Sequence, residues 1–143
     1  MEKLILKYDH LKKIHKNLNI SLERYDSALH DKNAEIETIY ERRDSVIKRF
    51  ELTYDLLWKY LREYIITEGI TVDSPKKVFQ HCLSLGLINT EKTKKLLDLS
   101  EDRNLTVHAY DMDTADRIAE DIKKYHTVIN FMIIQFPPNT ITK

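Results

Sequence analysis

The chain has 143 residues, of which 42% are hydrophobic and 32% charged, and its 23 basic and 23 acidic residues give a formal net charge of zero. This composition excludes an intrinsically disordered chain and fits a folded domain. The balanced charge also argues against a protein that coats nucleic acid, so any such contact must be local or transient.

The small numbers of glycine, proline and cysteine residues indicate the fold class and argue against a redox function. With 2 glycines and 3 prolines, the chain favours long helices over sheets. Its single cysteine, Cys82, is expected to be a buried helix residue rather than a redox centre. No run of about 18 apolar residues is present, and the apolar run in MEKLILKYDH is too short for a signal peptide. We therefore expect a soluble cytoplasmic protein with no membrane contact and one domain over residues 1–143.

Two long amphipathic helices are predicted in the first half of the chain. Over residues 3–29, apolar residues recur at helical spacing: Leu4, Leu11, Ile14, Leu18, Leu22, Tyr25 and Leu29. A second stripe follows the cap cluster DKN (31–33): Ile36, Ile39, Val46, Phe50, Tyr54, Leu57, Leu61, Tyr64 and Ile65. This helix is predicted to run to about Thr67, because Gly69 is well placed to end it.

A short third helix and a fourth helix are predicted next. Ser74 is a suitable cap and Pro75 suits the first helical position, whereas Gly86 stops the third helix. Asn89 or Thr90 then caps the fourth helix, which reaches residues 101–111.

The last predicted helix starts at DTAD (113–116), with Asp113 as the cap and Asp116 completing a capping box, and it ends before the prolines at 137–138. Together the elements predict an all-α fold: an up-and-down four-helix bundle with one additional short helix.

The segment EDRNLTVHAYD (101–111) places four chemically useful side chains at the end of the fourth helix: Arg103, Asn104, His108 and Tyr110. Arg103 and His108 are five positions apart, which on one continuous helix separates them by about 140°. If they cooperate, either the helix ends between them or a second chain of a two-fold dimer supplies the partner residue.

These residue types suit RNA cleavage without a metal. Histidine exchanges protons near neutral pH, and a guanidinium matches a phosphate. In this chemistry the 2′-hydroxyl attacks its own phosphate, His108 moves the protons and Arg103 neutralises the developing charge. Asn104 is placed to donate to an oxyanion or to hold the His108 ring.

Structural roles remain open for the same residues. Arg103 is also suited to pairing with a carboxylate or capping a helix end. His108 fits a helix C-terminus that faces the dipole, and Tyr110 fits a core position with its hydroxyl in water.

The segment RNLTVHAYD resembles the R-x4-H-x-Y signature of the HEPN superfamily. Three stretches resemble, in order and spacing, its subgroup of nucleotidyltransferase substrate-binding proteins: RRDSVIKRFELTYDLLWKYLREYI (42–65), SPKKVFQHCLSLGLI (74–88) and EDRNLTVHAYD (101–111). The resemblance covers residues 3–135.

The resemblance implies a helical bundle that forms a homodimer and has a minimal nucleotidyltransferase as its partner. In toxin–antitoxin pairs of this type, the HEPN subunit is an endoribonuclease toxin, and the nucleotidyltransferase neutralises it by AMPylation of the motif tyrosine. By this resemblance, Arg103 and His108 form the catalytic pair, Asn104 supports them, RNA is the substrate and Tyr110 is the modification acceptor.

Acidic residues around the motif support a different function. Glu101, Asp102, Asp111 and Asp113 are close in sequence, and carboxylates repel RNA phosphates. The alternative is a non-catalytic substrate-binding subunit that docks the nucleotidyltransferase and presents a nucleotide or acceptor to it. A helical scaffold that merely retains the motif is a third possibility.

The remaining polar clusters are given structural interpretations. The two basic runs are expected to be solvated helix faces rather than an RNA track: Lys92, Lys94 and Lys95, and Arg42, Arg43, Lys48 and Arg49. Four histidines lack metal-ligand spacing, so no metal and no other cofactor is expected: His10, His15, His81 and His126.

Overall fold

The computed structural model describes residues 2–67 and 69–138, which form five α-helices and one 3₁₀ turn. The elements are α1 (Glu2–Leu29), α2 (Ile36–Ile66), α3 (Pro75–Ser84), α4 (Thr90–Leu105), the 3₁₀ turn η1 (Thr106–His108) and α5 (Met112–Gln135). The described residues contain no strand, which confirms the all-α prediction. None of their helices combines the length and apolar character that a membrane span requires.

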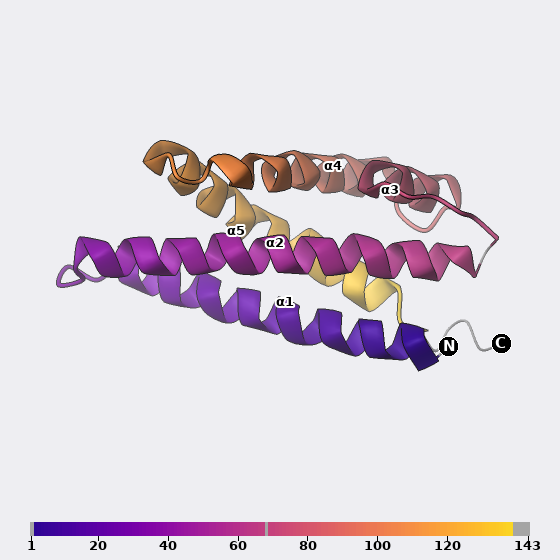
Figure 1. Ribbon diagram of the computed structural model, residues 1–143, viewed down its shortest axis with the longest axis horizontal. Helices are drawn as coiled ribbons and strands as arrows, with labels where there is room; N and C mark the ends of the chain where they lie inside the picture. The colour runs from indigo at the N-terminus through magenta and orange to yellow at the C-terminus, as the bar shows by residue number, and fades with distance from the viewer. Residues whose placement is uncertain (1, 68, 139–143) are drawn as a thin grey trace.

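The helix α2 forms the centre of the bundle. It packs against α1, α3, α4 and α5. Figure 1 shows α1 and α2 as a long antiparallel hairpin, with α5 running obliquely behind α2 and the α3–α4 pair along the opposite side. The four long helices alternate in direction, and α3 is the additional short helix of the predicted arrangement.

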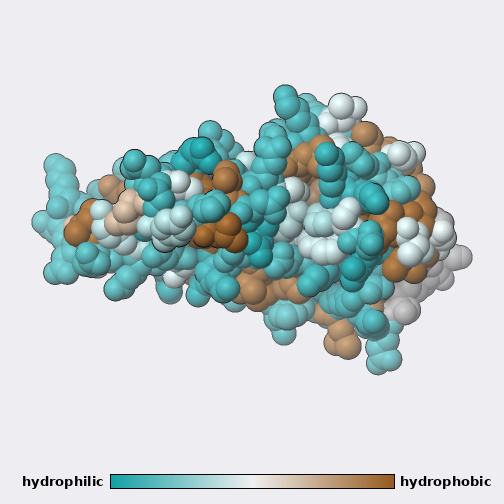
Figure 2. All heavy atoms as spheres, turned by 45° about the horizontal axis from the view of Figure 1, so that its top comes forward, coloured by the Kyte–Doolittle hydropathy of each residue, from teal (hydrophilic) through white to brown (hydrophobic). Residues whose placement is uncertain are grey.

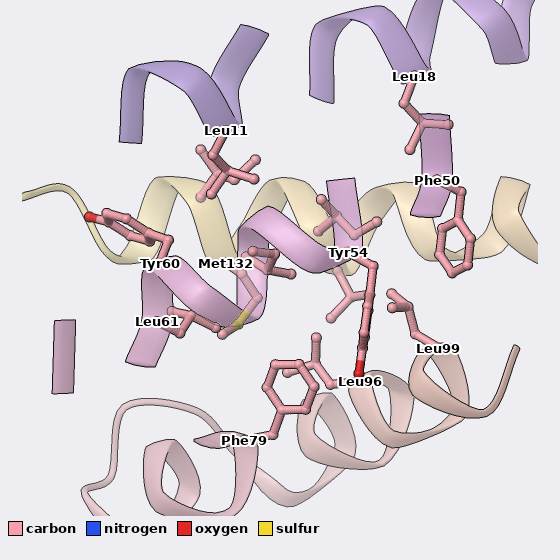
Figure 3. Close-up of a cluster of buried hydrophobic side chains, with 14 of the residues drawn as sticks. Leu11, Leu18, Phe50, Tyr54, Tyr60, Leu61, Phe79, Leu96, Leu99 and Met132 are labelled. Carbon is pink, nitrogen blue, oxygen red and sulfur yellow. The ribbon is translucent and has the colours of Figure 1, made fainter. Parts of the chain in front are cut away.

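All five helices contribute to one hydrophobic core. Figure 3 shows buried side chains from all five helices that meet in this core: Leu11 and Leu18 of α1, Phe50, Tyr54, Tyr60 and Leu61 of α2, Phe79 of α3, Leu96 and Leu99 of α4, and Met132 of α5. Each fully buried side chain of this kind stabilises the fold by about 1.5–3 kcal/mol relative to an exposed one. The helical spacing of these residues in the sequence is what lets each helix present one apolar face to α2.

The buried face of α1 is partly polar, in contrast to the predicted stripe. Four of its apolar members repeat every seven residues, at Leu4, Leu11, Leu18 and Tyr25, and Ala28 is buried as well. His15 and Ser21 occupy other buried positions of this face, where each contacts a polar side chain of another helix. The His15 ring stacks on His126 of α5 with 5.5 Å between centroids, and Ser21 accepts a 2.7 Å hydrogen bond from Arg49 of α2.

The predicted caps of α3 and α4 are confirmed. Ser74 accepts a hydrogen bond from the Lys77 amide at 3.4 Å, and Asn89 accepts one from the Lys92 amide at 2.8 Å. These side-chain oxygens satisfy amides that have no partner inside the helix. Asn89, rather than Thr90, is therefore the cap of α4.

Two glycines close helix ends as predicted. Gly69 and Gly86 have φ angles of +84° and +73°, which other residues rarely adopt. Their amides donate to carbonyl oxygens of the preceding turns, at Ile66 and Leu83, with lengths of 2.9 Å in both cases. These bonds satisfy terminal carbonyl groups of α2 and α3.

The predicted start of α5 is wrong by two residues. The cap is Asp111, whose Oδ2 accepts from the Thr114 amide at 3.0 Å and from the Thr114 hydroxyl at 2.7 Å. Asp113 lies inside the first turn instead. Asp116 does not complete a capping box, because the third helical position after the cap is Thr114; Asp116 instead accepts a 2.9 Å hydrogen bond from Arg43 of α2.

The start of α2 has no side-chain cap. The helix begins at Ile36, and the preceding Glu35 makes no capping hydrogen bond. The predicted cap cluster forms part of the α1–α2 connection, where Asp31 accepts a 2.9 Å hydrogen bond from the Asn33 amide.

The interpretation of the second basic run as a solvated face is wrong for Arg43. This side chain is only 3% exposed and pairs with Asp44 at 3.1 Å and Asp116 at 2.9 Å. The prediction that Cys82 is a buried helix residue is confirmed, and burial raises the pKa of its thiol to about 12.

Candidate functional site

The motif residues lie where α4 changes into η1 and α5 begins. The helix ends at Leu105, between Arg103 and His108, so these two residues do not lie on one continuous helix. The Ala109 amide donates to the Thr106 carbonyl, and the Asp111 amide donates to the His108 carbonyl, both at 3.1 Å. These two bonds form a tight connection that turns the chain from α4 into α5.

The Arg103 side chain is held against α2. Its Nη1 donates to Glu51 at 3.0 Å, and its Nε and Nη2 donate to the two Asp55 oxygens at 3.3 Å each. Burial disfavours the charge, but the hydrogen bond to Asp55 and the charges of both carboxylates outweigh it and raise the pKa of Arg103. The carboxylate-pairing role that the sequence left open is therefore realised.

Thr106 completes this network from the 3₁₀ turn. It is 7% exposed, and its oxygen accepts a 3.0 Å hydrogen bond from Arg103 Nη1. The Thr106 hydroxyl lies 2.8 Å from a Glu51 oxygen and 2.7 Å from the Arg103 carbonyl, either of which can accept its proton. The end of α4 is thereby fixed to α2.

The other three motif residues face solvent. Tyr110 is 82% exposed, which rules out the core position that the sequence also allowed, and Asn104 and His108 are exposed as well. The His108 and Tyr110 rings lie edge to face with 6.1 Å between centroids. Within the described part of the chain, no hydrogen bond or ion pair joins Arg103 to His108, and the Asn104 side chain has no hydrogen-bond partner.

Exposed apolar side chains flank the motif. Val107 is 67% exposed and Met112 is 44% exposed, on either side of His108 and Tyr110. Exposed apolar groups next to polar functional groups are typical of surfaces that bind another molecule. In the sequence, only their position distinguishes these two residues from core residues: Val107 lies inside the motif segment and Met112 directly follows it.

An acidic pocket lies beside the motif, between α4 and α5. It measures about 530 Å³ and is lined by Lys95, Asp98, Glu101, Asp102, Asp121, Lys124 and Tyr125. Burial is the main cause that raises the pKa of Asp102 to about 6, and the Asp121 carboxyl adds to it, although Tyr125 donates to Asp102 at 2.7 Å. Among the residues described, no three His, Cys, Asp or Glu side chains are arranged to hold a metal ion.

Sequence reasoning missed the α2 partners of the motif arginine. Glu51 and Asp55 are four residues apart and therefore share one helix face, but so do many carboxylates in this chain. Only the packing of α4 on α2 identifies these two as the partners of Arg103.

Comparison with known proteins identifies a family and two similar structures. Residues 6–135 match the model of the family described as nucleotidyltransferase substrate binding protein like. A crystal structure of a protein from Thermus thermophilus is similar, with 25% identity, a TM-score of 0.63, and coverage of 88% of this chain and 99% of that one. No curated protein matches the sequence.

A second solved structure shares the fold at lower identity. It is the tri-AMPylated HEPN toxin of Shewanella oneidensis in complex with an MNT antitoxin, with a TM-score of 0.65, 13% identity, and coverage of 87% of this chain and 94% of that one. The family model covers residues 6–135, so the chain belongs to the family of nucleotidyltransferase substrate-binding-like proteins, as the sequence resemblance predicted.

Proposed function

We propose that this protein is the HEPN toxin subunit of a toxin–antitoxin pair, a metal-independent endoribonuclease that a cognate minimal nucleotidyltransferase neutralises by AMPylation of Tyr110. The observation that carries the proposal is the exposed His108–Tyr110 ring pair on a turn that also fixes Arg103. A proton-transfer group and a nucleophilic hydroxyl are both accessible there, on the motif that the family resemblance assigns to them.

For the ribonuclease reaction, His108 removes the proton from the 2′-hydroxyl of RNA, whose oxygen then attacks the adjacent phosphorus. The bond from phosphorus to the 5′-oxygen breaks, and that oxygen takes up a proton, leaving a cyclic phosphate and a free 5′-hydroxyl. Arg103 stabilises the charge on the phosphate, and Asn104 donates a hydrogen bond to it. This requires the Arg103 guanidinium to turn from Glu51 and Asp55 toward the substrate.

A homodimer is part of the proposal. Val107 and Met112 present apolar surface beside the motif, which a second copy would cover. A two-fold axis near these residues brings two copies of His108 together, so that one acts as the base and the other as the acid.

For neutralisation, the Tyr110 oxygen attacks the α-phosphorus of ATP bound to the nucleotidyltransferase, and pyrophosphate leaves. The 82% exposure of Tyr110 supports this role, because the hydroxyl must enter the active site of another protein. Attached AMP adds negative charge and bulk next to His108, which repels RNA from the site.

The test is inducible expression of the parent and of the His108→Ala variant, with and without the nucleotidyltransferase, followed by growth. The parent alone arrests growth, the variant does not, and the partner relieves the arrest. His10→Ala is the matched control, since His10 is an exposed histidine outside the motif. A variant as toxic as the parent would refute the role of His108.

The state of Arg103 favours a second candidate function. Two carboxylates already neutralise its guanidinium, and the acidic pocket lies beside it, so RNA is repelled in this conformation. The chain then acts as a non-catalytic subunit that docks the nucleotidyltransferase and presents a substrate. This function predicts co-purification with the nucleotidyltransferase and no growth arrest by the parent in any arm of the test.

A further inference from the structure

A pocket between α1 and α2 gathers three arginines that the proposed function does not use. It measures about 150 Å³, and its lining residues are Ser21, Arg24, Arg42, Ser45 and Arg49. We infer that this arginine pocket binds a phosphate group.

Helix geometry builds the pocket from both helices of the hairpin. Residues 42, 45 and 49 share one face of α2, and residues 21 and 24 share one face of α1. Arg42 Nη1 donates to the Arg24 carbonyl at 3.2 Å, and Arg49 Nη1 donates to Ser21 Oγ at 2.7 Å. These bonds hold two of the three side chains at the joint between the helices, where both are half-buried.

The three guanidinium groups have no acidic partners among the residues that the structure describes. Within residues 2–67 and 69–138, no carboxylate forms an ion pair with them, and none lines the pocket. Arg43 and Arg103 behave differently, because each of them pairs with two carboxylates. In a protein of zero net charge, three uncompensated like charges around one pocket repel one another unless an anion joins them.

One neighbouring hollow does contain acidic groups. It is lined in part by Asp31 and Glu35, and it shares only Arg42 with the arginine pocket. Asp31 and Glu35 therefore lie next to the arginine pocket only on the side of Arg42. Arg24 and Arg49 do not line the acidic hollow.

The chemistry of the lining identifies the ligand class. Guanidinium and hydroxyl groups donate hydrogen bonds in the pattern that phosphate oxygens accept. The pocket is well below the roughly 300–1,000 Å³ of sites for drug-sized ligands, so it fits one phosphate group rather than a whole nucleotide. That group belongs either to a nucleotide, whose remainder stays outside, or to an RNA backbone.

Titration calorimetry of the purified full chain with inorganic phosphate, AMP and a short RNA tests this inference. The key variant is Arg24→Gln, because the Arg24 guanidinium has no hydrogen bond or ion pair with the described residues, so its loss leaves the fold intact. Lys13→Gln removes the same charge from the same helix outside the pocket and serves as the control. We expect Arg24→Gln to weaken phosphate binding roughly ten-fold and Lys13→Gln to leave it unchanged.

The three ligands distinguish the source of the phosphate. If RNA occupies the pocket, Arg24→Gln lowers the slope of log affinity against log salt by about 1. If a nucleotide occupies it, AMP binding weakens and the RNA slope is unchanged. A parent that binds no phosphate at millimolar concentration, or equal binding by the two variants, overturns the inference. Neither result bears on the proposed toxin, whose test is growth arrest through His108.

Discussion

At the scale of single residues, two carboxylates one turn apart on α2 hold the Arg103 guanidinium and compensate its charge. Glu51 and Asp55 hold the guanidinium by three hydrogen bonds, and Thr106 adds a fourth. A substrate phosphate has to compete with both carboxylates for the same donors. The arginine is therefore positioned by the fold, but its charge is already compensated in this conformation.

Asp102 is the neighbour of Arg103 in sequence. Unlike Arg103, which has two oppositely charged partners, Asp102 forms no ion pair with the described residues. Its pKa is raised from 3.8 to about 6, first by burial and then by Asp121, and only Tyr125 and Arg117 act in the other direction. The folded protein therefore binds the proton more tightly than the unfolded chain. The stability that the protonated Asp102 carboxyl contributes is fully present below about pH 4 and is lost as the pH rises through 6.

Replacing Asp102 with asparagine should stabilise the protein at neutral pH. The amide oxygen still accepts the hydrogen bond from Tyr125, and the buried charge is gone. We expect the free energy of unfolding to rise by roughly 1–3 kcal/mol at pH 7.5, with no gain at pH 4. Urea denaturation at the two pH values measures this. Asp98→Asn, an exposed carboxyl of the same pocket, is the control, and a destabilised Asp102→Asn protein at pH 7.5 would contradict the assignment.

His15 changes the stability with pH in the direction opposite to Asp102, over the same pH range. Burial, and then the charge of His126, lower the pKa of His15 from 6.5 to about 4. The unfolded chain therefore binds this proton more tightly, and stability is lost as the pH falls below 6.5. In the parent the two slopes partly cancel between pH 4 and 6, so the Asp102→Asn variant should show a steeper rise of stability with pH.

At the scale of elements, the junction of α4, η1 and α5 places the motif. The ending of α4 at Leu105 lets Arg103 face α2 while His108 and Tyr110 face solvent. The cap at Asp111 then starts α5 immediately after the motif. The orientation of the exposed pair therefore depends on where α5 begins.

Replacing Asp111 with alanine tests this junction. The Asp111 carboxylate, whose pKa is lowered by its hydrogen bonds from Thr114, caps the helix, and its loss leaves the Thr114 amide without that partner. We expect the midpoint of thermal unfolding to fall by a few degrees. Asp113→Ala, two residues further on, should change it little, because Asp113 is not the cap. Equal effects of the two substitutions would show that the helix starts elsewhere.

Helices and most of their ends were predictable because their signals are local. Ser74, Asn89, Gly69 and Gly86 act through backbone groups within a few residues, so sequence order alone identifies them. Asp113 was a wrong prediction because two aspartates offer a similar local signal, and the tertiary pair of Asp116 with Arg43 is not visible in sequence.

The site was predictable only in part, for the same reason. The motif spacing identified Arg103, His108 and Tyr110 as candidates. Their partners depend on which faces of distant helices meet, as with Glu51, which is 52 residues from Arg103. Sequence periodicity predicts that a face is buried, but it does not identify its neighbour.

At the scale of the whole molecule, the net charge is zero although acidic and basic side chains gather in separate regions. The acidic pocket lies between α4 and α5, whereas the arginine pocket lies between α1 and α2. Figure 2 shows a largely hydrophilic face that is interrupted by separate apolar patches. Such a surface suits defined contacts with a few partners rather than general adhesion to nucleic acid.

The most direct measurement of the central claim is the intact mass of the purified protein after incubation with its minimal nucleotidyltransferase, ATP and Mg²⁺. The account predicts a gain of one or more AMP units by the parent and by Tyr40→Phe, a control at a half-buried tyrosine, and none by Tyr110→Phe. A Tyr110→Phe protein that gains the same mass as the parent would contradict the assignment of Tyr110 as the acceptor.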